Sequence, residues 1–208
     1  IQTFNSLNNV YTSNTARNIG ATMSIMYCTL ISSINCLFMH NSHIYHTDHG
    51  IITTSAANTR HQTKAAFIKN QFIDNKVISL EVNCFYEVYI TSCIFEDNKH
   101  QAIFSQHNNI VRVINVLFFN NNGAVHFENS KLIIGINNTV AVNTESRQLS
   151  VSLNPATKQA SVLYFTKFNQ MKLIDCLLKQ NHAAHIANVM IYDGTELLII
   201  NCIFIQEN

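Results

Sequence analysis

The chain has 208 residues, of which 47% are hydrophobic and 12% are charged, and its formal net charge is +1. A chain this apolar is not intrinsically disordered, and its length suits one elongated domain over residues 1–208. It carries no basic run and no apolar run long enough for a membrane helix. We therefore expect no nucleic-acid partner and no transmembrane segment in this chain.

The two ends of the chain predict a domain that is incomplete on both sides. The sequence starts at Ile1, without Met, without a basic region and without the apolar stretch of a signal peptide. It stops at Asn208, inside a repeat. Residues 1–29 are the least regular part, and a clear pattern begins only after them.

A short motif recurs along the chain from Ile34 onward. Its first copy, Ile34–Asn41, alternates apolar with other residues, so in an extended strand the apolar side chains share one face. Neighbouring copies in the middle of the chain lie about 23 residues apart, a period typical of stacked supersecondary units. The further copies are Ile68–Asn75, Thr91–Asn98, Ile114–Asn121, Ile174–Asn181 and Ile200–Glu207.

A second short apolar segment follows most copies, as in Ala102–Phe104 and Ala184–Ile186. Two or three strands with polar corners leave no room in one repeat for a helix of ordinary length. The pattern therefore predicts an all-β fold, a parallel β-helix. Two irregular stretches, residues 47–62 and 143–160, are predicted to be insertions that loop out from corners of the coil; the second contains Pro155.

The copies with the form C-x-F-x-x-N resemble the repeats of right-handed parallel β-helix proteins, the pectin-lyase-like superfamily. They look most similar to adhesin-like surface proteins with C-x-F-x-N-N repeats, and the resemblance covers most of the chain. It departs at the start of the second strand, where only Asn122–Val125 shows the usual Gly-Gly-Ala-like pattern. The resemblance implies a right-handed solenoid of about 23 residues per coil in an extracellular or cell-surface protein.

Two classes of function are open at this point. Resemblance to the adhesin-like proteins implies a non-enzymatic module for adhesion or carbohydrate binding, with a carbohydrate or another surface protein as partner. The alternative is a polysaccharide hydrolase or lyase of the pectin-lyase-like superfamily. Asp74 and Asp97 lie on consecutive copies and would supply the paired acids that glycoside hydrolysis needs. An acidic side chain at a solvated β-corner is, however, common without any function.

Asparagine and histidine each recur at regular positions in the sequence. An asparagine ends most copies, and stacked coils would place these side chains about 4.8 Å apart in a hydrogen-bonded ladder. The ladder positions are Asn41, Asn75, Asn98, Asn121 and Asn181. Histidine recurs at every third residue as His40, His43, His46 and His49. Histidine clusters bind zinc or copper, but a spacing of three has no fixed meaning where strand faces alternate by two. We expect no metal and no cofactor.

The remaining patterns concern the two faces of the repeat. Four of the six cysteines, Cys36, Cys93, Cys176 and Cys202, share one inward position, and we expect buried thiols rather than disulfides. A bond between Cys176 and Cys202 is the open alternative, because adjacent coils would bring them together. The residue after the cysteine points outward and is mostly apolar, which indicates a surface covered either by an insertion or by a partner. This row contains Leu37, Ile94, Leu117, Leu177 and Ile203.

Overall fold

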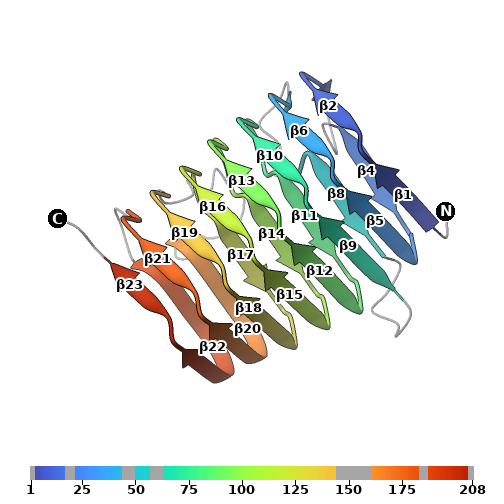
Figure 1. The fold of residues 1–208 in the computed structure, drawn as a ribbon. Helices are drawn as coiled ribbons and strands as arrows, with labels where there is room; N and C mark the ends of the chain where they lie inside the picture. Colours follow the sequence, from blue (N-terminus) through green and yellow to red (C-terminus); the bar gives the residue numbers. More distant parts are fainter. Residues whose placement is uncertain are drawn as a thin grey trace, which may run out of the picture.

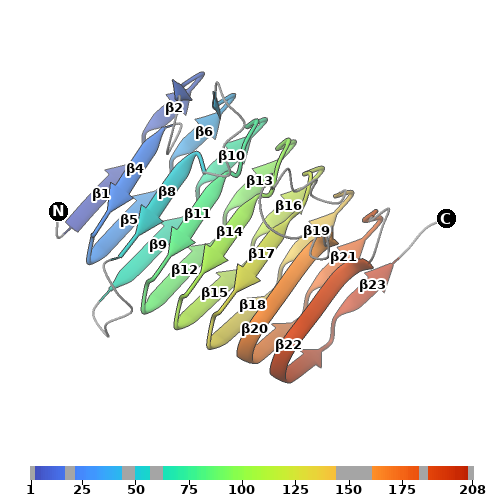
Figure 2. The same cartoon turned by 180° about the vertical axis from the view of Figure 1, so that it is seen from behind.

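The computed structural model describes residues 3–16, 22–43, 50–56, 63–143, 161–182 and 187–205. Within these ranges the chain is all β and contains no helix, and every strand pairing is parallel. Figures 1 and 2 show the strands stacked as successive coils of a β-solenoid, with β1 and β23 at opposite ends of the stack. The predicted all-β fold, a solenoid of stacked parallel strands, is confirmed.

Each coil consists of three legs, which we call first, second and third in chain order. The first leg contains the five-residue strands β1 (Thr3–Leu7), β5 (Leu30–Ile34), β9 (Lys64–Ile68), β12 (Glu87–Thr91), β15 (Ile110–Ile114) and β18 (Leu132–Ile136). The third leg contains β4 (Met23–Met26), β8 (Ile52–Ser55), β11 (Leu80–Asn83), β14 (Ile103–Gln106) and β17 (Val125–Glu128). The long strands β20 (Ser161–Ile174) and β22 (Ala187–Ile200) run from a third leg into a first leg, and β20 joins both legs in a 13-stranded sheet.

The second leg forms a separate eight-stranded sheet of three-residue strands. In order these are β2 (Val10–Thr12), β6 (Leu37–Met39), β10 (Gln71–Ile73), β13 (Ile94–Glu96), β16 (Leu117–Phe119), β19 (Thr139–Ala141), β21 (Leu177–Lys179) and β23 (Ile203–Ile205). Six of these strands carry the middle of a sequence motif, and β2 and β19 take the same place in coils where the motif has diverged. A small two-stranded sheet of β3 (Thr15–Ala16) and β7 (Ser42–His43) adds to the first coils.

The spacing between coils is regular in the middle of the stack and longer elsewhere. Equivalent asparagines are 23 residues apart between Asn75 and Asn98, and 22 between Asn121 and Asn143. The spacing grows to 34 residues between Asn41 and Asn75 and to 38 between Asn143 and Asn181. The extra residues include 44–49, 57–62 and 144–160, which lie outside the described residues, as does Pro155.

The stretch 47–62, predicted as an insertion, is not one uninterrupted loop. Ile52–Ser55 forms strand β8, which pairs with β4 and β11 in the third leg. Its sequence looks polar because threonine occupies inward as well as outward positions; Thr54 points inward, is fully buried, and its hydroxyl donates to the Glu81 carbonyl. The predicted short strand at Ala184–Ile186 falls outside the described residues.

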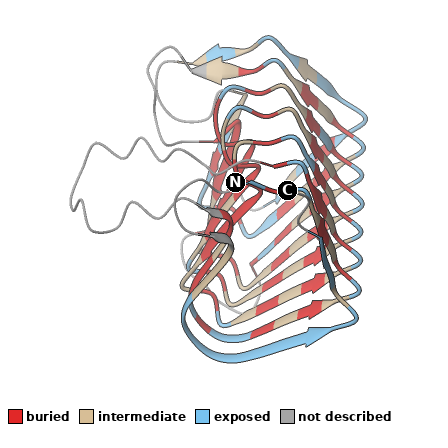
Figure 3. Ribbon diagram, turned by 90° about the vertical axis from the view of Figure 1, so that its left-hand side faces the viewer, coloured by how far each residue is buried: buried red, intermediate tan, exposed pale blue. Residues whose placement is uncertain are grey.

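An aromatic row fills the interior behind the second leg. The rings of Phe38, Phe72, Phe95 and Phe118 stack in parallel, with centroids 4.7 to 5.3 Å apart, and Tyr11 extends the row at one end. Strand register continues it through Val140, Leu178 and Phe204. Figure 3 shows the nested coils, with buried and partly exposed positions alternating along the strands. Phe95 is fully buried, which confirms the register that the motif predicts.

The coils turn at left-handed backbone positions, which recur at three corners. The φ angle is 54° at Asn35 on the first corner, 56° at Asp97 on the second and 55° at His107 on the third. Asparagine and aspartate tolerate this conformation because their short polar side chains bond locally, whereas other non-glycine residues lose about 1–2 kcal/mol there. Gly123 is the one glycine with positive φ among the described residues, so the corners are built mainly from polar side chains.

The aromatic row predicts a large stability effect at its centre. Phe95→Ala should lower the free energy of unfolding by about 3–5 kcal/mol, because it opens a cavity between two stacked rings. Urea unfolding followed by circular dichroism measures the loss. Phe119→Ala is the matched control, since Phe119 lies on the adjacent β16, points outward and is 38% exposed. Equal effects of the two substitutions would contradict the assigned register.

Val142 predicts a gain in stability. It is a β-branched residue at a left-handed corner, with a φ angle of 57°, and its side chain is 38% exposed. Val142→Asn should therefore raise the free energy of unfolding by about 1 kcal/mol, because strain is removed and little burial is lost. The reverse change at a left-handed position of the first corner, Asn115→Val at φ 55°, should lower it by a similar amount. Both shifts are measured by urea denaturation, and a loss of stability in Val142→Asn would refute the strain argument.

Candidate functional site

The two predicted catalytic acids occupy the second corner, between the second and third legs. Asp74 and Asp97 are both in the left-handed conformation, with φ angles of 46° and 56°, on consecutive coils. The same row contains Ser13, His40, Asn120, Val142 and Gln180. Most residues in this row are polar, and the left-handed backbone favours short polar side chains, which is sufficient to explain an aspartate.

Each of these carboxylates is bonded to a neighbour in the row. Asp74 Oδ2 lies 3.0 Å from His40 Nδ1, and its Oδ1 lies 3.7 Å from Lys99 Nζ. Asp97 Oδ1 accepts a hydrogen bond from Asn120 Nδ2. General acid–base catalysis by two carboxyl groups needs environments that push their pKa values apart. Both aspartates are partly exposed on the outside of the coil, where Asp74 faces the basic groups of His40 and Lys99 and Asp97 faces a neutral amide.

One residue farther on, the asparagine side chains form a continuous ladder. Nδ2 of each asparagine donates to Oδ1 of the next, at 2.7 to 3.2 Å. The same Oδ1 also accepts the backbone N–H of the preceding ladder asparagine. The structure brings together all five predicted positions and adds Asn14 and Asn143. These two follow Tyr11 and Val140, which occupy the phenylalanine position, so matching apolar residues of any kind to that position would have found them.

Further buried amides support the other corners. Asn70 and Asn138 take the inward position otherwise held by cysteine, where each accepts a backbone N–H and donates to a carbonyl of a neighbouring coil. Asn108 does the same at the third corner. Since these amides lie inside the coil with their hydrogen bonds satisfied, they are structural and face no ligand.

The four candidate metal-binding histidines do not form a described cluster. His40 pairs with Asp74, and His43 lies in the short strand β7. His46 and His49 fall outside the described residues. In the ranges that the structure covers, no group of three histidine, cysteine or acidic side chains could hold a metal ion.

The six cysteines all lie in the described residues, and none of them forms a disulfide, as predicted. Burial raises the pKa of the Cys93 thiol to about 12, and burial is also the main reason that the pKa of Cys176 is raised. Such thiols are poor nucleophiles at neutral pH. Cys176 and Cys202 take equivalent positions on adjacent coils, and each thiol bonds the carbonyl two residues before it.

The outward side of the eight-stranded sheet, which we call the second-leg face, is mostly apolar. It consists of two rows with two outward residues per strand. One row is Val10, Leu37, Gln71, Ile94, Leu117, Thr139, Leu177 and Ile203, and the other is Thr12, Met39, Ile73, Glu96, Phe119, Ala141, Lys179 and Ile205. Only Glu96 and Lys179 among these are charged. Side chains within a row partly cover one another, which explains the intermediate exposure of Leu37, Ile94 and Leu117.

Sequence reasoning missed two buried ionisable residues that point outward from the third leg. Glu81 is 6% exposed, and its carboxylate accepts hydrogen bonds from Gly50 N, Thr53 Oγ1 and Asn83 Nδ2. His126 is 7% exposed and lies between Phe104 and Tyr164. The alternating pattern marks both positions as outward and therefore as solvent-facing, so it carries no signal for their burial.

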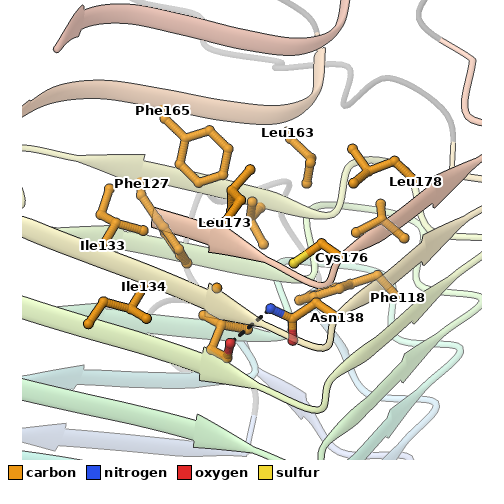
Figure 4. Close-up of a pocket in the computed structure, with 14 residues that line it drawn as sticks. Phe118, Phe127, Ile133, Ile134, Asn138, Leu163, Phe165, Leu173, Cys176 and Leu178 are labelled. Atoms are coloured by element: carbon orange, nitrogen blue, oxygen red, sulfur yellow. Dashed lines mark hydrogen bonds between the residues drawn. The ribbon is translucent and has the colours of Figure 1, made fainter. Parts of the chain in front are cut away.

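The interior holds a small apolar cavity between the coils of β18, β19 and β20, drawn in Figure 4. Its volume is about 40 Å³, and its lining includes Phe118, Phe127, Leu163 and Leu173. Val140 and Gly135 stand there in rows that other coils fill with larger residues. Pockets for small organic molecules measure about 300–1,000 Å³, so this space is a packing defect and not a ligand site.

Comparison of the chain with protein-family models, with curated proteins and with solved structures finds no match. The described ranges contain no helix that is long and apolar enough to cross a membrane. Functional inference for this chain therefore rests on its own geometry.

The ladder predicts a sharp stability effect at Asn98, whose amide makes four hydrogen bonds to Phe72, Asn75 and Asn121. Asn98→Ala should lower the free energy of unfolding by about 3–5 kcal/mol, because several buried partners lose their bonds at once. Asn109→Ala, at a half-exposed asparagine, should change it by less than about 0.5 kcal/mol. Thermal and urea unfolding of both variants give the comparison, and a mild effect at Asn98 would show that the ladder is dispensable.

Proposed function

We propose that this chain is a non-enzymatic β-solenoid module of an extracellular or cell-surface protein, acting in adhesion. The observation that carries the proposal is that both candidate acids lie partly exposed on the outer corner of the coil, in a backbone conformation that accounts for an aspartate. Each carboxylate is bound by neighbouring polar side chains. A catalytic pair needs one group held protonated, which calls for a secluded environment that neither position provides.

The second-leg face is the contact surface that suits adhesion best. It is a sheet of stacked rows in which Phe119 is exposed and Leu37, Ile94 and Leu117 are partly exposed. Large contiguous apolar patches on a protein surface usually mark interaction sites. Its near-neutral charge favours an apolar protein surface as partner over a strongly charged one.

Carbohydrate binding is the second candidate, and the polar second corner favours it. His40, Asp74, Asp97 and Asn120 follow one another along the stack and offer donors and acceptors at the repeat of the coils, and Gln180 lies beyond Val142. A glycan chain lying along this row would meet polar groups at four consecutive coils. Binding here requires no turnover.

Activity on polysaccharides tests the non-enzymatic assignment. We expect no reducing ends and no unsaturated products when the purified chain is incubated with neutral and acidic polysaccharides, with and without calcium. Cleavage that Asp74→Asn or Asp97→Asn abolishes would replace the module by a hydrolase or lyase. The same substitutions serve as controls for glycan binding, which they should weaken if the second corner holds the sugar.

The contact surface is tested with the immobilised chain and a panel of extracellular-matrix and cell-surface proteins. Binding through the second-leg face should fall at least tenfold in Ile94→Glu, because a charge is placed within an apolar contact. Asn109→Glu is the control for the added charge: Asn109 is half-exposed and lies at the third corner, away from this face. Equal losses for both substitutions would point to long-range charge effects, and no loss for either would exclude this face.

A further inference from the structure

His126 is, with Glu81, one of the two buried ionisable residues that point outward from the third leg. It lies on β17, yet it is only 7% exposed. Its ring meets Phe104 of β14 and Tyr164 of β20 edge to face, with centroids 4.9 and 4.5 Å away. A titratable ring is thus enclosed between two aromatic rings of adjacent coils, and neither the adhesion proposal nor the packing of the core uses it.

The hydrogen bonds of this imidazole are incomplete. Nδ1 lies 3.4 Å from Gln101 Nε2, a donor, so the neutral ring carries its proton on Nε2. Nε2 is buried and has no hydrogen-bond partner among the described residues. The nearest acidic atom is Glu128 Oε2 at 3.9 Å, beyond hydrogen-bond distance. One polar N–H is therefore buried unsatisfied, which destabilises the closed arrangement.

The charged groups near the His126 ring are not placed to stabilise a positive charge on it. Glu128 accepts from Gln106 Nε2 of β14, from Asn129 Nδ2 and from Lys167 Nζ of β20. Lys167 is itself a cation facing the same carboxylate, and Tyr164 and Phe104 supply only ring edges. Glu128 is thus already engaged, and a second cation at His126 has to compete for it.

We propose that His126 is an acid-sensitive switch: its protonation opens the outer side of the third leg at β14, β17 and β20. In the closed state the imidazolium would be a buried cation without a committed partner, whereas in the opened state water solvates it. A proton from solvent binds Nδ1, the ring nitrogen that carries none in the closed state, and no covalent bond other than that N–H changes. Protonation therefore favours whichever arrangement exposes the ring.

The direction of the pH effect follows from the two states. Burial lowers the pKa of His126 from 6.5 to about 4 in the closed state, and Glu128 only partly opposes this. The opened state binds the proton at the ordinary pKa, so closure is fully favoured above pH 6.5 and is lost progressively as pH falls toward 4. Between pH 7 and pH 5 the opening equilibrium constant should rise about 20-fold.

Hydrogen–deuterium exchange of the full chain tests this inference, with rates corrected for the intrinsic effect of pH. Peptides that cover β14, β17 and the first half of β20 should lose protection about 20-fold between pH 7 and pH 5. Peptides from β10 and β13, on the opposite leg, serve as the internal reference. In His126→Phe, which keeps the aromatic contacts and cannot titrate, the loss should disappear. Unchanged protection of the wild type, or equal acid sensitivity of His126→Phe, would overturn the proposal.

An NMR titration of the His126 imidazole in the wild-type chain gives a second readout, which does not depend on whether His126→Phe folds. We expect a midpoint well below 6.5 in the closed state. A midpoint near 6.5, with a single resonance throughout, would show that the ring titrates without any opening and would refute the switch.

Discussion

One asparagine amide per coil joins the stack together at the second corner. Its Oδ1 accepts both the backbone N–H and the side-chain N–H of the preceding asparagine, and its Nδ2 donates to the next asparagine and to a carbonyl of the preceding coil. Left-handed corners expose backbone groups that a sheet ladder cannot pair, and the amide supplies their partners. Because every bond is made to an adjacent coil, each coil's corner depends on its neighbours. The ladder therefore propagates the parallel register from Asn14 to Asn181.

This constraint also explains why the coil tolerates additions. Spacing between ladder residues varies from 22 to 38, and the hydrogen bonds stay within 2.7 to 3.2 Å. Loop closure becomes only slowly less favourable with loop length, so extra residues between two legs change the ladder little. Residues 44–49 and 144–160 both fall between a second and a third leg. The number of residues between ladder asparagines can thus vary while the ladder itself stays the same.

The same constraint changes the interpretation of the polar residues. A position that must be left-handed selects aspartate, asparagine, serine or histidine for backbone reasons, so acids appear there without any catalytic requirement. Outward positions on the second leg carry no such requirement, yet most of them are apolar. A surface property that the backbone does not demand is the stronger indication of a partner, which is why the adhesion proposal rests on the second-leg face. His126 follows the same logic, because nothing in the β-structure requires a histidine between two aromatic rings.

The sequence by itself determined the repeat, the strand alternation, the inward phenylalanine row and the main asparagine positions, because these depend on local periodicity and on backbone preferences at corners. It also predicted thiols without disulfides, since the cysteines fall on an inward position. It did not reveal that Ile52–Ser55 is a strand, that Asn14 and Asn143 extend the ladder, or that Glu81 and His126 are buried. Pairing between coils decides the first, a wider match to the phenylalanine position would have found the second, and packing of segments far apart in sequence decides the third. Only the tertiary structure brings those neighbours together, and a period read along one chain contains no information about them.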